Sequence, residues 1–193
     1  HTKLPIHLAS GGGFALKLER TFVTEVKPSA VPAGKGIPSF YKKYLEVDGL
    51  YIVSSDKVRD EALEKAYEIV SLMLAKRPDV KQYMVSKGCH VMIIGEHEEV
   101  CDLPEYAHIC NTPENIAFWN KRARGFGGAP EDDFSASCGE ENVLAFPGDK
   151  YVGENILIHE FAHLFHTIGI VGVEPDFDRS EERRVGKECP YRC

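Results

Sequence analysis

One apolar stretch, "ILIHEFAHLFHTIGI" (residues 156–170), constrains this chain more than any other feature. In a helix, His159 and His163 lie one turn apart on the same face. Two imidazoles at that spacing bind a single zinc ion from one side. Glu160 lies about 100° around the helix, where it flanks the metal and takes a proton from a zinc-activated water as general base. This HExxH pattern predicts one helix over residues 153–168.

The alternative interpretation is a buried helix whose polar side chains are satisfied by hydrogen bonds. Two histidines and a glutamate within five residues would then each need a partner in a core of low dielectric constant. Because one metal ion is a partner for both histidines at once, the sequence favours Zn²⁺ as the cofactor.

A catalytic zinc site needs a third protein ligand, and the residues after the motif do not identify it. Metzincins place Gly and then His at three-residue intervals after the second histidine, whereas this chain has His166 and then Gly169. We therefore expect His166 to line the pocket or to orient a ligand. Glu174, Asp176 and Asp178 are less favoured candidates for the third ligand. We expect a Glu beyond the chain end, as in gluzincins.

The pattern upstream predicts an α+β domain with a small mixed sheet and one active-site helix. Strands are expected at residues 49–55, 89–96 and 142–148 ("NVLAFPG"). Helices are expected from an Asp56 cap to about residue 75, at 79–87, and after Thr112 and Pro113. Residues 97–110 and 124–142 are expected to be loops.

The acidic stretch "GEENVLAFPGD" (139–149) is a candidate upper edge of the cleft. A strand there could bind an extended peptide by strand addition, or it could be a plain sheet strand with a solvated turn. Glu140 and Glu141 would favour basic substrates in the first case and face water in the second.

The two ends of the chain differ from its middle. Residues 1–40 contain a possible strand (14–26) and Gly/Pro-rich linkers, and they either belong to an upstream module or brace the main domain, residues 41–178. In residues 179–193 the charge density rises, and "RSEERRVGKEC" resembles translated sequencing-adapter DNA. We expect this tail to be an artefact, with a solvated basic tail as the alternative, and the domain to be incomplete.

Four of the six cysteines lie outside that tail, a number compatible with two disulfides and an oxidising compartment. A short loop makes Cys101 and Cys110 the favoured pair. The alternatives are free buried thiols, and a structural zinc site whose spacing matches no common zinc module. The four cysteines are Cys89, Cys101, Cys110 and Cys138, and the zinc site would use His97, Cys101, His108 and Cys110.

Composition and charge narrow the partners. The chain is 43% hydrophobic and 27% charged, which is typical of a globular domain. A net charge of -7 argues against nucleic acid or an anionic membrane as the main partner. Uninterrupted apolar runs are shorter than the roughly 20 residues of a bilayer span, so no transmembrane helix is predicted. A peptide or protein substrate is the expected partner.

The block "SCGEENVLAFPGDKYVGENILIHEFAH" (137–163) resembles secreted zinc metallopeptidases of the zincin-like superfamily, distantly related to the anthrax lethal factor catalytic domain. The resemblance extends to "KRARGFGG" (121–128) and "YIVSSDKVRDEAL" (51–63). It implies an extracellular zincin-like domain with His159 and His163 as zinc ligands and Glu160 as general base. The third Glu ligand of the family, and the Tyr or His that stabilises the oxyanion, have no match here.

Three functions follow from these patterns. Zinc-dependent peptide-bond hydrolysis is favoured, although the chain as given is expected to bind zinc weakly and to be nearly inactive. A non-catalytic extracellular binding domain on a zincin scaffold is the alternative, against which the intact "HEFAH" argues. Hydrolysis of another amide or an ester would use the same spacing.

Overall fold

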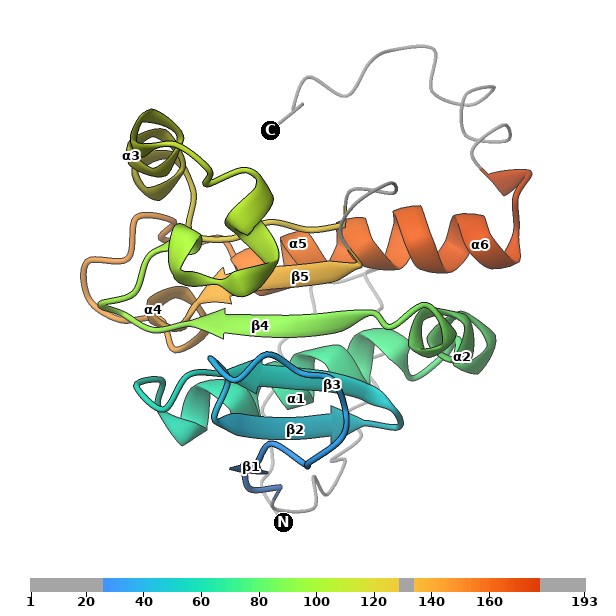
Figure 1. The fold of residues 1–193 in the computed structure, drawn as a ribbon. Coiled ribbons are helices and arrows are strands. Elements are labelled where there is room, and N and C mark those ends of the chain that lie inside the picture. Colours follow the sequence, from blue (N-terminus) through green and yellow to red (C-terminus); the bar gives the residue numbers. More distant parts are fainter. Residues whose placement is uncertain (1–25, 129–133, 178–193) are drawn as a thin grey trace, which may run out of the picture.

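A mixed five-stranded sheet organises the part of the chain that the computed structural model describes, residues 26–128 and 134–177 (Figure 1). The strands lie in chain order: β1 and β2 pair antiparallel, as do β2 and β3, while β3, β4 and β5 are parallel. The predicted α+β class with a mixed sheet is confirmed. The strand bounds are Ser29–Ala30, Lys43–Val47, Leu50–Ser54, His90–Ile94 and Ser135–Gly139.

The connections between strands are a tight turn between β2 and β3 and a helical crossover between β3 and β4. Strands β2 and β3 form a hairpin whose turn residues, Asp48 and Gly49, both have positive φ (48° and 100°), as a type I′ turn requires. Parallel strands need a long crossover, and β3 reaches β4 through helices α1 (Asp60–Leu74) and α2 (Pro78–Ser86). The predicted βααβ order is therefore correct, although β2 was not expected.

Helix α1 carries the predicted apolar stripe. Its buried residues recur at helical spacing and pack on the sheet: Ala62, Leu63, Ala66, Ile69, Val70 and Leu74. The predicted cap is wrong, because the helix begins after Arg59 and not at Asp56. Tertiary contact sets this start, since the N–H of Arg59 donates to the Glu140 carboxylate at 2.9 Å.

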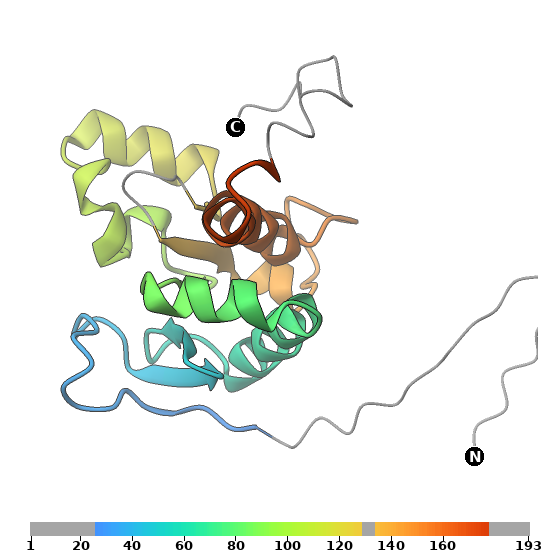
Figure 2. The same cartoon turned by 90° about the vertical axis from the view of Figure 1, so that its right-hand side faces the viewer.

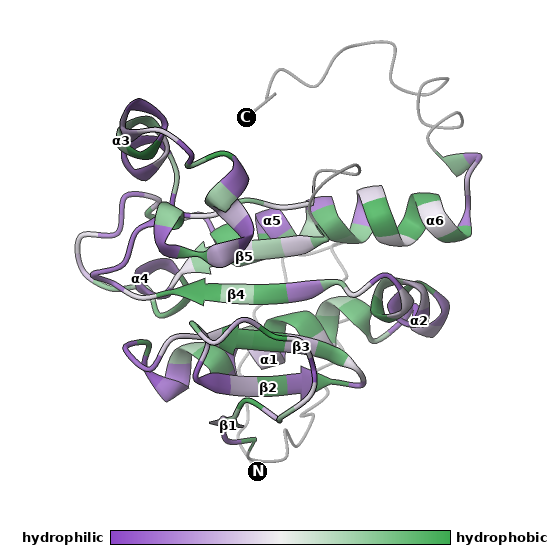
Figure 3. Ribbon diagram, viewed as in Figure 1, coloured by the Kyte–Doolittle hydropathy of each residue, from purple (hydrophilic) through white to green (hydrophobic). Residues whose placement is uncertain are grey.

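Both faces of the sheet are covered (Figures 2 and 3). Helices α1, α2 and α5 (Ile156–Leu164) pack on one face, against residues that include Ile52, Val91 and Ile93. Aromatic and aliphatic side chains from the loops cover the other face, which presents Val53, Met92 and Ile94. Since successive strand residues point to opposite faces, burial on both sides explains the continuous apolar runs of β3 and β4.

Two 3-10 turns help to cover the second face, and helix α3 packs outside the first of them. The turns are η1 (Val100–Asp102) and η2 (Pro104–His108), and α3 (Pro113–Arg122) starts at Thr112, whose hydroxyl accepts the Asn115 N–H at 3.2 Å. This confirms the predicted helix start. None of the residues of α3 is buried.

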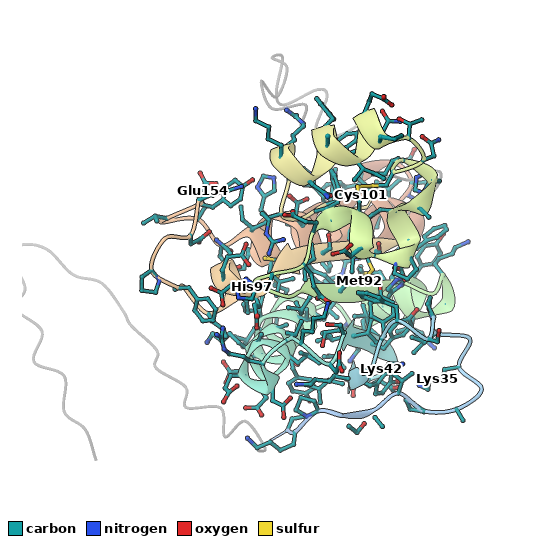
Figure 4. All side chains as sticks on the ribbon, turned by 60° about the vertical axis from the view of Figure 1, so that its left-hand side comes forward. Lys35, Lys42, Met92, His97, Cys101 and Glu154 are labelled. Carbon is teal, nitrogen blue, oxygen red and sulfur yellow. A yellow bond between two sulfur atoms is a disulfide. The ribbon has the colours of Figure 1, made fainter. Side chains whose placement is uncertain are left out.

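A disulfide joins Cys101 to Cys110, with their Cα atoms 5.6 Å apart, beside α3 (Figure 4). It confirms the favoured pair and rules out the structural zinc alternative with His97 and His108, because neither sulfur is a free thiolate. Cys89 and Cys138 are both buried, and they are not joined to each other by a disulfide.

The region before the active-site helix corrects two predictions. The expected loop at 124–142 contains β5, Ser135–Gly139, and all five of its residues are buried. The expected strand at 142–148 is wrong, because the chain forms helix α4 (Glu140–Val143) and then turns. The small residues of β5 have weak strand propensity, so the neighbouring strands and not the local sequence fix this pairing.

The helix that bears the motif was predicted at residues 153–168, but it starts and ends later in the chain. Helix α5 starts after Asn155, whose side chain accepts the Ile158 N–H, and continues as a π-helical segment η3 (Phe165–Ile170) and as α6 (Val171–Val173). By length and composition alone, Ile156–Val173 could cross a membrane. Its histidines and Glu160 interrupt the apolar run, so no transmembrane helix was predicted from the sequence. Most of its large apolar residues pack in or against the core of this domain, although Ile158 is exposed.

The N-terminal segment is described only from residue 26. Strand β1 pairs with β2. Val31, Ile37 and Phe40 pack on the sheet face that presents Met92, so residues 26–40 brace the sheet. The strand expected at 14–26 falls outside the described residues except for its last one, and Asp178 and the tail at 179–193 lie wholly outside them.

Candidate metal centre

His159 and His163 converge on one face of α5. Their Nε2 atoms are 3.1 Å apart, and their ring centroids are 4.8 Å apart. Two nitrogens that are each about 2.1 Å from one tetrahedral zinc ion would be about 3.4 Å apart. The i, i+4 spacing therefore brings the two donors close to the separation that a shared ion needs.

Both rings are exposed, which corrects the argument from burial. The buried residues of α5 lie on its other side, whereas His159, Ala162 and His163 are exposed. Exposed imidazoles are solvated, so burial does not require a metal or any other partner for them. The case for a metal depends on the convergence of the rings and on the groups beside them.

Glu160 is half-buried next to the exposed pair. Burial raises the pKa of Glu160 above its ordinary value, and the charge of His159 partly offsets this rise. A carboxylate with a raised pKa is a stronger base. The pKa of His163 is lowered by desolvation and by the charges of His159 and His166, which favours the neutral ring that binds metals.

A glycine-rich segment, residues 124–128, forms the edge of the sheet beside α5 (Figure 1). It runs antiparallel to β5: the N–H of Ser137 donates to the carbonyl of Phe126 at 2.7 Å, and the N–H of Gly139 to that of Arg124 at 2.8 Å. The expected loop therefore supplies a strand-like edge, which we call the edge segment.

Glycines let the edge segment contact the helix backbone directly. A Cβ atom on Gly127 would lie 2.1 Å from the carbonyl oxygen of Glu160, and one on Gly128 would lie 2.8 Å from the Cα of Leu164. No side chain fits at those distances. The edge segment is therefore seated on the turn of α5 that carries Glu160.

Helix geometry places the histidines on the open side of this contact. At about 100° per residue, Glu160 faces the edge segment, Phe161 turns toward the core, and His159 and His163 turn the opposite way. The outward peptide groups of the edge segment belong to Gly125 and Gly127, and they make no hydrogen bond with the described residues. An unpaired strand edge thus lies beside the two imidazoles.

Buried polar contacts hold the start of the edge segment. The guanidinium of Arg124, 8% exposed, donates from Nε and Nη2 to the Glu141 carboxylate at 2.6 and 2.8 Å. It also donates to the carbonyls of Gly95 and Glu98. A bidentate guanidinium–carboxylate pair has a fixed geometry, so Arg124 fixes where the segment begins.

Aromatic contacts hold the middle of the edge segment. The ring of Phe126 packs edge-on against Tyr106 (5.1 Å between centroids) and Trp119 (5.3 Å). The hydroxyl of Tyr106 also bonds that of Ser137 in β5 at 2.8 Å. The disulfide-linked turns and α3 therefore help to hold the edge in place.

Glu140 and Glu141 do not have the roles expected for them. Glu140 is 3% exposed, and its carboxylate accepts the N–H groups of Arg59 and Glu96 at 2.9 and 3.0 Å. Glu141 is paired with Arg124. Both carboxylates tie loops together at the end of β5, so they neither face water freely nor wait for a basic substrate.

The other candidate ligands that the sequence offered do not complete a metal site with His159 and His163. Glu174 forms an ion pair with Arg77 at 2.7 Å, and the ring of His166 packs edge-on against Phe177. Within residues 26–128 and 134–177 there is no group of three His, Cys, Asp or Glu side chains that could hold a metal. Neither Glu174 nor Asp176 therefore joins the histidines, and the described residues bring only these two imidazoles together.

Sequence reasoning missed the edge segment and Arg124. Three glycines in "RGFGG" looked like a loop signal, because Gly favours turns when nothing is known of its neighbours. Glycines also permit another backbone to approach closely, so the same residues are compatible with a strand packed directly on a helix.

No protein-family model, curated protein or solved structure matches this chain.

Proposed function

We propose that this chain belongs to an extracellular zinc peptidase with a zincin-like fold, in which His159 and His163 are ligands and Glu160 is the general base. The third ligand would come from outside the described residues. One observation carries the proposal: two converging imidazoles, a half-buried carboxylate and an unpaired strand edge meet at one place. The disulfide supports an oxidising compartment.

The donor set fits zinc in kind and in spacing, but it is incomplete. When bound, zinc would act as a Lewis acid toward water and the substrate carbonyl. Glu160 accepts a proton from the attacking water and later delivers it to the leaving amine. Its raised pKa suits both transfers, because the carboxylate holds the proton more firmly than an exposed one would.

The edge segment supports an extended peptide as the substrate. A peptide that pairs with the outward groups of Gly125 and Gly127 would add a strand to the sheet. Because Gly127 lies directly over the backbone of Glu160, a peptide bond held there is next to the general base. Strand addition is therefore assigned to residues 124–128 and no longer to 139–149.

One observation favours a second function, a non-catalytic extracellular domain that binds peptides at the same edge. The described residues hold only two metal ligands, and two imidazoles bind zinc weakly. Such a domain would bind an extended peptide without cleaving it.

Zinc titration and a peptide-library cleavage assay on the full natural chain test the proposal. Glu160→Gln should keep zinc and lose about 10²- to 10⁴-fold in hydrolysis, because the amide cannot accept the proton. His163→Ala should lose zinc, whereas His97→Ala, which removes an exposed histidine elsewhere, should change neither property. Zinc binding without cleavage would favour the peptide-binding domain, and no zinc binding would refute the metal site.

A further inference from the structure

Thr167 is where the edge segment and the histidine-bearing helix share a hydrogen bond. Its hydroxyl oxygen lies 2.8 Å from the carbonyl oxygen of His163 and 3.2 Å from that of Gly128. A hydroxyl has one hydrogen, so the two carbonyls share it or receive it in turn. Between the edge segment and Ile156–Val173, this is the one hydrogen bond that the described residues make.

The helix changes form at this point. Residues Phe165–Ile170 are π-helical, and Thr167 lies inside that segment. A π turn interrupts the regular pairing of each N–H with the carbonyl four residues back, and such turns are frequent at functional sites. The Thr167 hydroxyl restores a bond to the carbonyl four residues back, which belongs to His163.

The remaining contacts between the edge segment and the helix are steric. Gly127 packs on Glu160 and Gly128 packs on Leu164 through backbone atoms. Van der Waals contacts of this kind hold two surfaces together but have little directional preference along the helix axis. A hydrogen bond has a preferred direction, so it opposes sliding. A Cβ atom on Gly128 would also lie 3.1 Å from the Thr167 hydroxyl, so Gly128 keeps the space for this bond.

We propose that Thr167 is a positioning residue that fixes the edge segment relative to His163 and Glu160. The proposal rests on the proposed function, because its purpose is to hold an edge-bound peptide over the general base. A slide of the edge along α5 would move the peptide bond away from Glu160, and a misplacement of about 1 Å can lower a rate about 100-fold. Thr167 acts through the backbone and touches neither substrate nor metal.

Two substitutions separate the hydroxyl from the shape of the side chain. Thr167→Val keeps the branched shape and removes the donor, and Thr167→Ser keeps the donor. We expect Thr167→Val to lower kcat about 10-fold or more, with KM and zinc affinity within about threefold of the wild type. Thr167→Ser should restore kcat. Ser86→Ala is the matched control, because Ser86 donates to the carbonyl of Tyr83 at the end of α2, far along the chain from the edge segment.

Amide hydrogen exchange tests, without an activity assay, whether the Thr167 hydroxyl holds the edge segment in place. The N–H of Gly128 bonds Ser135 at 3.0 Å and the N–H of Ser137 bonds Phe126, so both amides report the pairing of the edge segment with β5. Both should exchange about 10-fold faster in Thr167→Val and at the wild-type rate in Thr167→Ser and Ser86→Ala.

The outcomes are distinct. Slower turnover and faster exchange in Thr167→Val, both restored by Thr167→Ser, support the proposal. Unchanged exchange at Gly128 and Ser137 overturns it, and so does a parallel loss of zinc, thermal stability and activity that Thr167→Ser does not restore. If the full natural chain cleaves no peptide, the proposed peptidase function fails, and the exchange rates alone decide whether Thr167 holds the edge segment to the helix.

Discussion

Helices α1 and α5 pack on the same face of the sheet, but their outward sides meet different surroundings. The outward side of α1 is solvated and mostly polar, with Leu72 as an exposed apolar residue, and its apolar stripe accounts for most of its sequence. Helix α5 buries a similar stripe, yet its other side presents His159 and His163 to solvent and places Glu160 beneath a strand edge. Packing therefore explains most of α1 but only the buried side of α5, and the exposed side of α5 is the candidate site.

The glycine contact is the sharpest difference between the two helices, and breaking it should have the largest effect. Gly127→Val should lower the free energy of unfolding by about 4 kcal/mol or more, because its Cβ atom would lie 2.1 Å from a backbone oxygen of α5 that cannot move aside. Urea unfolding measures this. Gly36→Val is the control, since open space surrounds Gly36 and only its positive φ opposes a side chain. Equal losses in the two variants would contradict a close contact at Gly127.

The buried sides of the two helices should respond alike. Leu63 in α1 and Leu157 in α5 are both fully buried, so each Leu→Ala change should cost about 3 kcal/mol. Only Leu157→Ala should also weaken zinc binding, because it disturbs the helix that carries the two proposed ligands. Calorimetry with and without zinc distinguishes the two variants, and an equal loss of zinc affinity in both would argue against a site on α5.

Zinc should stabilise the folded chain by binding to α5, and substitutions in α1 should leave this stabilisation unchanged. At a free zinc concentration 100 times its Kd, a ligand that binds only the folded state adds about 2.7 kcal/mol to the free energy of unfolding. His163→Ala should abolish this gain, and a chelator should reverse it. Glu68→Ala, which removes a partly exposed carboxylate from α1, should retain the gain. A gain that survives His163→Ala would place the metal elsewhere.

The smallest effect concerns the ionisation of Glu160 in the metal-free protein. Its pKa is raised by burial, so the folded chain holds this proton more tightly than the unfolded chain does. That stabilisation is fully present below about pH 4.3 and is lost as the pH rises through the folded pKa. Glu160→Gln should therefore raise stability at pH 7 by less than about 1 kcal/mol and have no such effect near pH 4. Urea unfolding at both pH values checks this, with Glu61→Gln on the exposed side of α1 as the control.

Elements with strong periodicity could be predicted from the sequence. The apolar runs of β3 and β4, the stripe of α1 and the cap of α3 carry their own signals, and the structure has them where expected. Strand β5 and helix α4 carry no such signal. The small residues of β5 are a strand because β4 pairs with them, and α4 begins where the Glu140 carboxylate binds two distant amides. Contacts between residues far apart in sequence decided both elements.

The candidate site likewise has features that the local sequence predicts and features that depend on tertiary contacts. The separation of the two imidazoles follows from the helical spacing of His159 and His163, which is a local property. Their exposure, the closeness of Gly127 to Glu160 and the bond of Thr167 depend on how the edge segment packs against α5. No spacing rule contains that information, because it relates two segments that are separated by almost thirty residues of chain.

The fit of Gly127 against Glu160 has a consequence for how such chains diverge. A lineage that acquires a side chain at this position must lift the edge segment from the helix, which would carry the strand edge away from the motif glutamate. Substitutions at the two positions should therefore be correlated among descendants, with a larger residue at 127 accompanying loss of the glutamate or of its histidines. Gly127 is thus a marker for ancestry: a remote relative that keeps both the glycine and "HEFAH" should have inherited the same contact between the edge segment and the helix.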